Sequence, residues 1–496
     1  MRFNSSFFFS SLGRSMSTLS AFIERSRLPR GCFRGRLRPR VNVAKRVVVL
    51  CGVMLVATAC HGLLDVTDPT VLKNSDLASA SGANARRLNT VLMLSQNIGG
   101  AFQDVAAFSD ERMWDTRIAP ATLWGNMMLN MDRRDGDAMA TLYAADNRDG
   151  HLDDLDQIFA ASSPAVYAMR LYGADSIKHE YLAQLFAIRG YVLLQMAEDM
   201  CPGFPINDIS SGNQPVYSQP YTTDSAFAYA SAQLDSALVH GRDSARFVNF
   251  ARVVQGRALL DLGQYGRADS VVTSVPTDFA YLTDEAVRAA QPLLWSQRYG
   301  CCAYVGDHDG GNGLPFRSAH DPRVGTVFKR FDLATGTDSL FDQVKYANGD
   351  TPLVLASGIE ARLIQAEVAL HNDDPSWLAI LNTLRTTCTD ASTCPSPPAG
   401  TGGVAGLAPL SDPGTPTARV DLVYRERAFW LYITGRRLGD MRRLVRNYGR
   451  AIESVFPSGT YHNPVGGTYG TATSIPFTLA AQARFNPHIT TGCTAP

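Results

Sequence analysis

The sequence predicts a mostly α-helical protein, built as a tetratricopeptide-like helical repeat array with long irregular loops. Apolar residues recur at three- and four-residue spacing through most of the chain, while alternating β-branched runs are few. Residues 250–268 have the pattern of a helical hairpin, and long stretches without a hydrophobic period separate the helical segments. These three observations favour an elongated helical array over a mixed α/β fold.

The apolar period places the helices in chain order. The first carries a stripe at Leu88, Val91, Leu92, Ser95 and Ile98. The others are expected near residues 136–160, 176–200, 223–240, 248–262, 265–274, 357–371, 375–388 and 419–447. The irregular stretches between them are 201–222, 276–356 and 389–418. Loops of this length in a compact protein usually carry function.

The hairpin at 250–268 follows the L-G-x-Y-x-x-A core of a tetratricopeptide unit. Gly263 is expected to end its first helix, and the small Ala268 lets the second helix pack closely. Further candidate units lie at 183–196 and at 360–384. Such a unit buries its apolar face only against neighbours, so three or more are expected.

Residues 41–60 are typical of a bacterial lipoprotein export signal. Lys45 and Arg46 precede an apolar run of 13 residues, Val47 to Ala59, which is too short to span a bilayer. Ala57-Thr58-Ala59-Cys60 resembles a lipobox, with Ala57 where Leu is commoner. The mature chain is therefore expected to begin at a lipidated Cys60. An ordinary signal peptide cut near Ala59 and an uncleaved anchor are the alternatives.

Residues 1–59 are expected to be an N-terminal extension and signal peptide that are removed from the mature protein. Residues 1–40 are rich in arginine and longer than a normal n-region, so translation is expected to start further downstream. Residues 1–59 hold ten arginines, one lysine and one glutamate, which leaves 35 basic and 45 acidic residues in the mature part, a formal charge of −10. This sign disfavours nucleic-acid binding, which needs clustered Lys and Arg.

Six cysteines follow Cys60, and an even number in an exported protein indicates disulfides. Cys388 and Cys394 bracket a short polar loop that a local disulfide could close. Cys201, Cys301, Cys302 and Cys493 allow three pairings, in which the adjacent Cys301 and Cys302 are expected to pair outward. A metal site is disfavoured, because there is no C-x-x-C and the histidines are scattered.

No catalytic motif stands out, so the chain is not expected to be an enzyme or to hold a cofactor. It contains no G-x-S-x-G, H-E-x-x-H or Walker A sequence. Residues 307–312 place oxygen ligands beside glycines, which suggests either a calcium loop or a plain glycine-rich turn. The segment lacks the bidentate Glu and the spacing of an EF-hand, and this favours the turn.

The C-terminal segment from Tyr424 to Leu444 resembles the ERxxELxxEGxRxxDLRR segment of SusD/RagB-like outer-membrane nutrient-binding lipoproteins. Trp430 and Tyr432 depart from this pattern, and Cys201 replaces the usual Gly-Asp of an upstream turn. The other segments that resemble the family, in the same order, are Ser109-Asp110-Glu111, 185–205, 359–367, 381–385, Ile475-Pro476-Phe477 and 486–489.

The resemblance covers about residues 60–496, here divided into parts at about 60–275 and 276–496. It implies a SusD-like α-α superhelix whose ligand surface lies in the loops. The ligand-binding candidates are the aromatic and polar loop residues Trp114, Asp115, Arg117, Trp124, Trp295, Tyr299 and Tyr304. Aromatic faces stack on sugars, but the same rings could simply pack the loops against the array. Glu426 is expected to form structural ion pairs with Arg436 or Arg437.

The function that the resemblance implies is capture of a glycan or peptide by a non-enzymatic lipoprotein at the outer-membrane surface. The nutrient would pass to a SusC-like, TonB-dependent channel, over which the protein lies as a lid. Two alternatives remain. One is a tetratricopeptide scaffold for envelope proteins, and the other is a lipid-anchored hydrolase.

Overall fold

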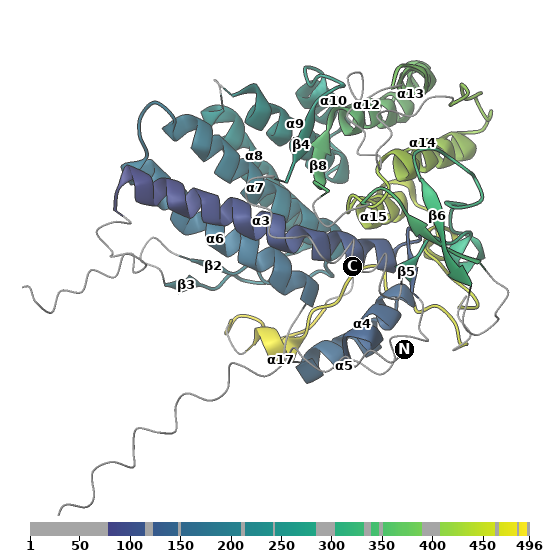
Figure 1. Cartoon of the computed structure of the whole chain (residues 1–496), viewed down its shortest axis with the longest axis horizontal. Coiled ribbons are helices and arrows are strands. Elements are labelled where there is room, and N and C mark those ends of the chain that lie inside the picture. Colours follow the sequence, from purple (N-terminus) through teal and green to yellow (C-terminus); the bar gives the residue numbers. More distant parts are fainter. Residues whose placement is uncertain are drawn as a thin grey trace, which may run out of the picture. The chain divides into compact units, whose positions relative to one another are not determined.

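The fold is seen in a computed structural model, and α7 (Lys178–Asp199) lies at its centre (Figure 1). Every residue from Leu182 to Asp199 is buried, which requires neighbours on all sides of the helix. The residues that the structure describes are 78–114, 123–146, 150–209, 214–241, 244–283, 303–331, 339–346, 351–388, 407–461, 466–483 and 486–493.

Helices make up most of the described residues. The helices up to residue 272 are α3 (Ala80–Phe108), α4 (Leu123–Asp132), α5 (Gly136–Asp146), α6 (Gly150–Tyr172), α7, α8 (Thr223–His240), α9 (Ala245–Asp261) and α10 (Tyr265–Val272). After it come η2 (Asp309–Gly311), α12 (Gly358–His371), α13 (Ser376–Thr387), α14 (Pro416–Trp430), α15 (Arg437–Tyr448), α16 (Ile452–Val455) and α17 (Leu479–Gln482). Among these helices, none combines the length and apolar character needed to cross a membrane.

Helices that are neighbours in sequence are mostly neighbours in space, as a repeat array requires. In the order α6, α7, α8, α9, α10, α12 and α13, each helix packs on the next one. At the other end of this series, α3 packs on α6. The hairpin predicted at 250–268 is α9 and α10. A Cβ on Gly256 would lie 2.4 Å from Val272 Cγ1, so the glycine allows these two helices their close approach. The tetratricopeptide-like helical array predicted from the sequence is confirmed.

Side-chain caps explain several helix starts. Ser79, Thr222, Ser357 and Thr415 each accept a hydrogen bond from the backbone N–H three residues later, at 3.0–3.2 Å. The predicted starts of α8 and α12 therefore agree with the structure within one residue.

The segment 419–447, predicted as one helix, is two helices, and this is a correction. The chain leaves α14 at Leu431 and begins α15 at Arg437, with Ile433 at φ 47° and Gly435 at φ 73° between them. Neither residue can continue a right-handed helix in that conformation. The stretch 136–160 is likewise divided, between α5 and α6, and α4 is a helix that the sequence pattern did not predict.

Short strands occupy parts of stretches predicted to be irregular. They are β1 (Met113–Trp114), β2 (Asp208–Ile209), β3 (Pro215–Val216), β4 (Ala280–Leu282), β5 (Ala303–Tyr304), β6 (Thr326–Phe331), β7 (Ser339–Gln343) and β8 (Val354–Ser357). They form four antiparallel pairs: β1 with β5, β2 with β3, β4 with β8 and β6 with β7. The strands have two to six residues, too few for a clear alternating pattern in the sequence.

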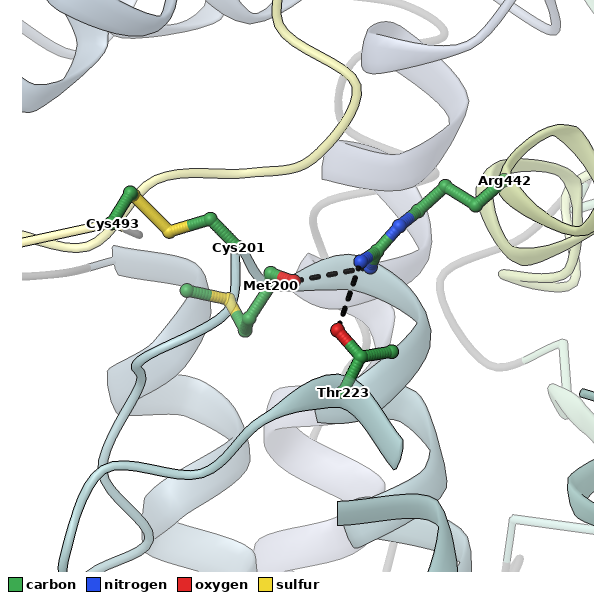
Figure 2. Close-up of a disulfide and its surroundings, with 5 residues drawn as sticks. All are labelled: Met200, Cys201, Thr223, Arg442 and Cys493. Carbon is green, nitrogen blue, oxygen red and sulfur yellow. Dashed lines mark hydrogen bonds between the residues drawn. A yellow bond between two sulfur atoms is a disulfide. The ribbon is translucent and has the colours of Figure 1, made fainter. Parts of the chain in front are cut away.

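A disulfide between Cys201 and Cys493 ties the C-terminal segment to the exit of α7 (Figure 2). Backbone hydrogen bonds support it, because Ile475 N–H donates to Asp199 and Cys201 N–H donates to Ile475. Because Cys201 and Cys493 pair with each other, the predicted outward pairing of Cys301 and Cys302 with these two cysteines is wrong. Cys388 is also disulfide-bonded. Its predicted partner Cys394 lies outside the described residues, as do Cys301, Cys302 and Cys60.

Candidate functional site

Three of the predicted ligand-binding aromatics lie on β1, α4 and β5, and two of them, Trp114 and Trp124, are in contact. Strand β1 pairs with β5, which places Met113 opposite Tyr304 and Trp114 opposite Ala303. Trp124, at the start of α4, meets Trp114 edge to face, with 5.2 Å between ring centroids. We call Trp114 and Trp124 the aromatic face. Tyr304 lies opposite Met113 in the ladder, so its side chain is on the other side of the strand pair from that of Trp114.

The three rings differ in exposure. Trp124 is 40% exposed, Tyr304 is half-buried, and Trp114 is only 1% exposed. Trp114 therefore supports Trp124 from below, and Trp124 is the ring most open to a partner from solvent. Asp115, Arg117, Trp295 and Tyr299 lie outside the described residues, so their roles stay predictions.

The aromatic face is fastened to the core through Ser109-Asp110-Glu111. Asp110 accepts two hydrogen bonds from the Arg437 guanidinium, at 2.7 and 3.0 Å. Glu111 accepts one from the Ile433 N–H at 2.8 Å. The end of α3 is thereby held against the turn between α14 and α15. These bonds fix where β1 begins and thus where Trp114 stands.

Asp132, at the last position of α4, links three segments beneath the aromatic face. One oxygen of its carboxylate accepts hydrogen bonds from the backbone N–H of Trp114 and from the Tyr461 hydroxyl, each at 2.7 Å. Tyr461 packs edge to face on Tyr469, with centroids 5.1 Å apart. Burial raises the pKa of Tyr461, and nearby Asp132, Tyr304 and Asp309 raise it further. The Tyr461 hydroxyl therefore stays protonated at neutral pH and remains a donor to Asp132.

No sequence pattern singles out Asp132, Tyr461 or Tyr469. The two tyrosines lie in a glycine-containing C-terminal segment without a hydrophobic period, and Asp132 ends a helix that was not predicted. Their proximity to Trp114 depends on contacts across more than 300 residues, such as Tyr461 with Asp132. A local motif could not have identified them.

The perturbed pair Glu111 and Lys345 is a second candidate site, since such pairs often mark catalysis. Burial raises the pKa of Glu111 to about 8 and lowers that of Lys345 to about 7. However, Glu111 is 1% and Lys345 6% exposed. Lys345 donates to the Tyr432 carbonyl, and Glu111 holds the Ile433 N–H. Both side chains thus clamp the turn between α14 and α15, where substrate has no access.

The charged residues of α14 and α15 form buried ion pairs. Arg443 contacts Glu367 at 2.9 Å, Asp440 at 2.7 Å and Asp261 at 3.2 Å. Arg427 pairs with Asp440 at 2.8 Å. All five side chains are at most 3% exposed. These arginines join α9, α12, α14 and α15 and have a structural role.

The predicted structural role of Glu426 is confirmed, but its predicted partners are wrong. Glu426 pairs with Arg323 at 2.6 Å and with Arg385 at 2.8 Å. Arg436 instead contacts Glu360 at 3.3 Å, and Arg437 contacts Asp110. The break between α14 and α15 explains the difference, because it turns the two arginines away from the face that carries Glu426.

The acidic side chains of the glycine-rich turn at 307–312 accept hydrogen bonds from other residues of the same chain. Asp307 accepts hydrogen bonds from the N–H groups of Arg317 and Ser318, and Asp309 accepts one from the Tyr469 hydroxyl. Within the described ranges, no group of three or more His, Cys, Asp or Glu side chains could hold a metal ion.

Comparisons with known structures show which fold this is. A SusD superfamily protein from Bacteroides thetaiotaomicron matches with a TM-score of 0.57 at 12% identity, covering 84% of this chain and 100% of that one. The chain has the SusD-like fold. A SusD superfamily protein from Bacteroides vulgatus matches with a TM-score of 0.57 at 14% identity, covering 84% and 99% of the two chains.

A SusD-like carbohydrate binding protein from Bacteroides vulgatus shares the SusD-like fold, with a TM-score of 0.50, 13% identity, and coverage of 84% of this chain and 93% of that one. No protein-family model matches the chain, and no curated protein matches it in sequence. At these identities the likeness concerns the fold, and the fold expected from the sequence motifs is confirmed.

Proposed function

We propose that this protein is a non-catalytic lipoprotein that binds a nutrient, glycan or peptide, at the outer-membrane surface and delivers it to a TonB-dependent channel. The observation that carries the proposal is the aromatic face, in which Trp124 is exposed and is supported by the buried Trp114. A rigid exposed indole offers a flat apolar surface for a sugar ring or an aromatic side chain.

Two further points support a binding role. The neighbour named as a SusD-like carbohydrate binding protein shares the fold over most of both chains. The strongly perturbed Glu111 and Lys345 are sealed inside the protein, which leaves no reactive group of that pair for a substrate. Lipidation of Cys60 would place the protein at the membrane, and residues following it would serve as the tether.

The test is a glycan and peptide binding screen by calorimetry on the mature protein, followed by the Trp124→Ala variant. Loss of the stacking ring should weaken binding of any ligand found by about five- to thirtyfold, since a stacked aromatic contributes about 1–2 kcal/mol. Tyr172→Ala is the matched control, because Tyr172 is 39% exposed on α6 and lies outside the aromatic face. Equal affinities of the two variants would count against the aromatic face as the ligand site.

Delivery and anchoring need their own tests. A Cys60→Ala variant should no longer be labelled by a fatty-acid probe and should leave the membrane fraction. Wild-type protein purified in mild detergent should bring a large TonB-dependent channel with it. A Cys60→Ala protein that still sediments with the outer membrane would reject the lipid anchor, whatever the ligand.

A further inference from the structure

A pocket of about 330 Å³ lies between the start of α8, the helix α15 and the C-terminal segment, away from the aromatic face. This volume is at the small end of ligand pockets and suits a molecule of monosaccharide size. Its lining combines two arginines, one aspartate, three threonines and four apolar residues: Arg442, Arg446, Asp224, Thr222, Thr223, Thr473, Pro202, Val445, Ile452 and Phe456.

Arg442 is the unusual member of this lining. It is 7% exposed, yet among the described residues no carboxylate lies within ion-pair distance of it. Its Nη1 donates to three carbonyls at the end of α7, including those of Glu198 at 2.5 Å and Met200 at 3.0 Å. Its Nη2 has only a long contact of 3.4 Å to the Thr223 hydroxyl (Figure 2).

The two amino groups of Arg442 therefore serve different purposes. Nη1 satisfies the last carbonyls of α7, as a cation at a helix C-terminus commonly does. Nη2 points toward Thr223, the first residue of α8 (Figure 2), and Thr223 also lines the pocket. Burial lowers the pKa of Arg442 to about 10, and nearby Arg446 lowers it too. The carboxylates of Asp199, Asp261 and Glu198 raise its pKa, but none of them lies within ion-pair distance, and the guanidinium remains charged at neutral pH.

Other groups at the pocket favour an anion there. Arg446 lies one turn after Arg442 on α15, so both side chains share one helix face. Arg446 is paired at 2.6 Å with Asp224, but that carboxylate is 74% exposed and the pair is thus weakly held. The N-terminus of α8 also faces the pocket through Thr222 and Thr223, and its dipole adds positive potential.

The remaining wall distinguishes an organic acid from a simple inorganic anion. Pro202, Val445, Ile452 and Phe456 give the pocket an apolar side, which sulfate or phosphate would not use. The hydroxyls of Thr222, Thr223 and Thr473 can pair with hydroxyl groups of a ligand. Charge, hydroxyls and apolar wall together match a hydroxylated carboxylic acid.

We propose that this pocket binds the carboxylate of a small hydroxylated organic acid, such as a uronic acid residue, between Arg442 and Arg446. A planar carboxylate would accept hydrogen bonds from Arg442 Nη2 and from the Arg446 guanidinium, which releases Asp224 to solvent. The body of the acid would lie against Phe456 and Ile452. This site is separate from the aromatic face and does not depend on the proposed function.

The first test compares three probes by calorimetry at low ionic strength: D-glucuronate, D-glucose and sulfate. Glucuronate should bind at least about tenfold more tightly than either, since glucose lacks the charge and sulfate lacks the apolar and hydroxyl contacts. Equal binding of glucose would reject the role of the arginines. Equal binding of sulfate would reject an organic acid, and failure of glucuronate to bind at all would overturn the proposal.

The second test locates the site. Arg446→Gln should weaken glucuronate binding about tenfold, since it removes one charge-assisted contact. Arg450→Gln is the matched control, because Arg450 forms a comparable surface pair with Asp421 at 2.8 Å and does not line the pocket. Ile452→Trp, which fills the pocket from its apolar wall, should abolish binding. Unchanged affinity in both Arg446→Gln and Ile452→Trp would overturn the assignment.

Trp124→Ala separates this inference from the proposed function. It should leave glucuronate binding unchanged, while it weakens any nutrient bound at the aromatic face. A loss of glucuronate binding in Trp124→Ala would move the acid to the aromatic face and reject the pocket.

Discussion

The buried ion pairs of α14 and α15 and the aromatic face are both assembled from segments far apart in the sequence, but water reaches only one of them. Arg427 and Arg443 are fully covered and are surrounded by carboxylates of α9, α12 and α15. Trp124, by contrast, leaves 40% of its surface exposed and rests on a single buried indole. The first region holds helices together, while the second offers a surface.

This difference separates the residues that determine the fold from those that can determine a ligand. A buried charge that loses its partner is costly, because water cannot replace the lost contact. An exposed ring can change with little effect on folding. The resemblance in sequence is accordingly concentrated in the segment containing Arg427, Asp440 and Arg443, and it indicates the scaffold more directly than the ligand.

The buried Arg443 gives the largest expected effect on stability. Arg443→Ala removes the cation that Glu367, Asp440 and Asp261 share and leaves Arg427 to pair with Glu367 and Asp440, so we expect a loss of about 3–5 kcal/mol in the free energy of unfolding. Urea unfolding at neutral pH measures it. Arg450→Ala removes only a half-exposed pair with Asp421 and should cost about 1 kcal/mol or less. Equal costs would mean that the buried ion pairs do not hold the fold.

The turn between α14 and α15 gives the next largest effect. Gly435 has φ 73°, and an added Cβ would lie 2.7 Å from the Phe102 ring, so Gly435→Ala combines backbone strain with a clash. We expect a loss of about 2–4 kcal/mol. Gly263→Ala is the control, because Gly263 has φ 68° with open space around it, and it should cost about 1 kcal/mol. Matching melting temperatures for the two variants would show that the turn is not tightly packed.

The sequence predicted the helical array well and the candidate site only in part. Helices such as α8 and α12 carry their signals locally, in a capping threonine or serine and an apolar stripe. The break at Ile433 and Gly435 was missed, because its cause is the contact of that turn with Glu111 and Lys345 from distant segments. Trp114 and Trp124 of the aromatic face are among the seven candidate ligand residues named from the sequence, but Asp132 and Tyr461, which position Trp114, have no local signature.

The buried His151 makes the stability of the protein depend on pH. The His151 ring donates toward Asp104 at 3.2 Å and Asp199 at 3.0 Å. Burial opposes its charge, but the hydrogen bonds to the two carboxylates outweigh burial and raise the pKa of His151 to about 10. Because the pKa of His151 is higher in the folded state than in the unfolded state, the charged imidazole contributes its full stabilisation below about pH 6.5. This contribution is lost as the pH rises toward 10.

His151→Gln should therefore remove a stability slope of up to about 1.4 kcal/mol per pH unit between pH 6.5 and 10. Urea unfolding across that range, with wild type and variant side by side, measures the difference. The exposed His371→Gln is the control and should keep the wild-type slope. Parallel curves for wild type and His151→Gln would show that the buried imidazole does not hold a proton between the two acids.

The smallest change in stability is expected on the aromatic face, where a substitution should cost much less than one at the buried Arg443. Trp124→Ala removes an exposed ring and one edge-to-face contact with Trp114, so we expect a loss of only about 0.5–1.5 kcal/mol in the free energy of unfolding. The same variant should lose most of its affinity for a bound nutrient, whereas the main effect of Arg443→Ala should be a loss of stability. If Trp124→Ala destabilised the protein as much as Arg443→Ala, the aromatic face would belong to the core, and its exposure would give no reason to assign it a ligand.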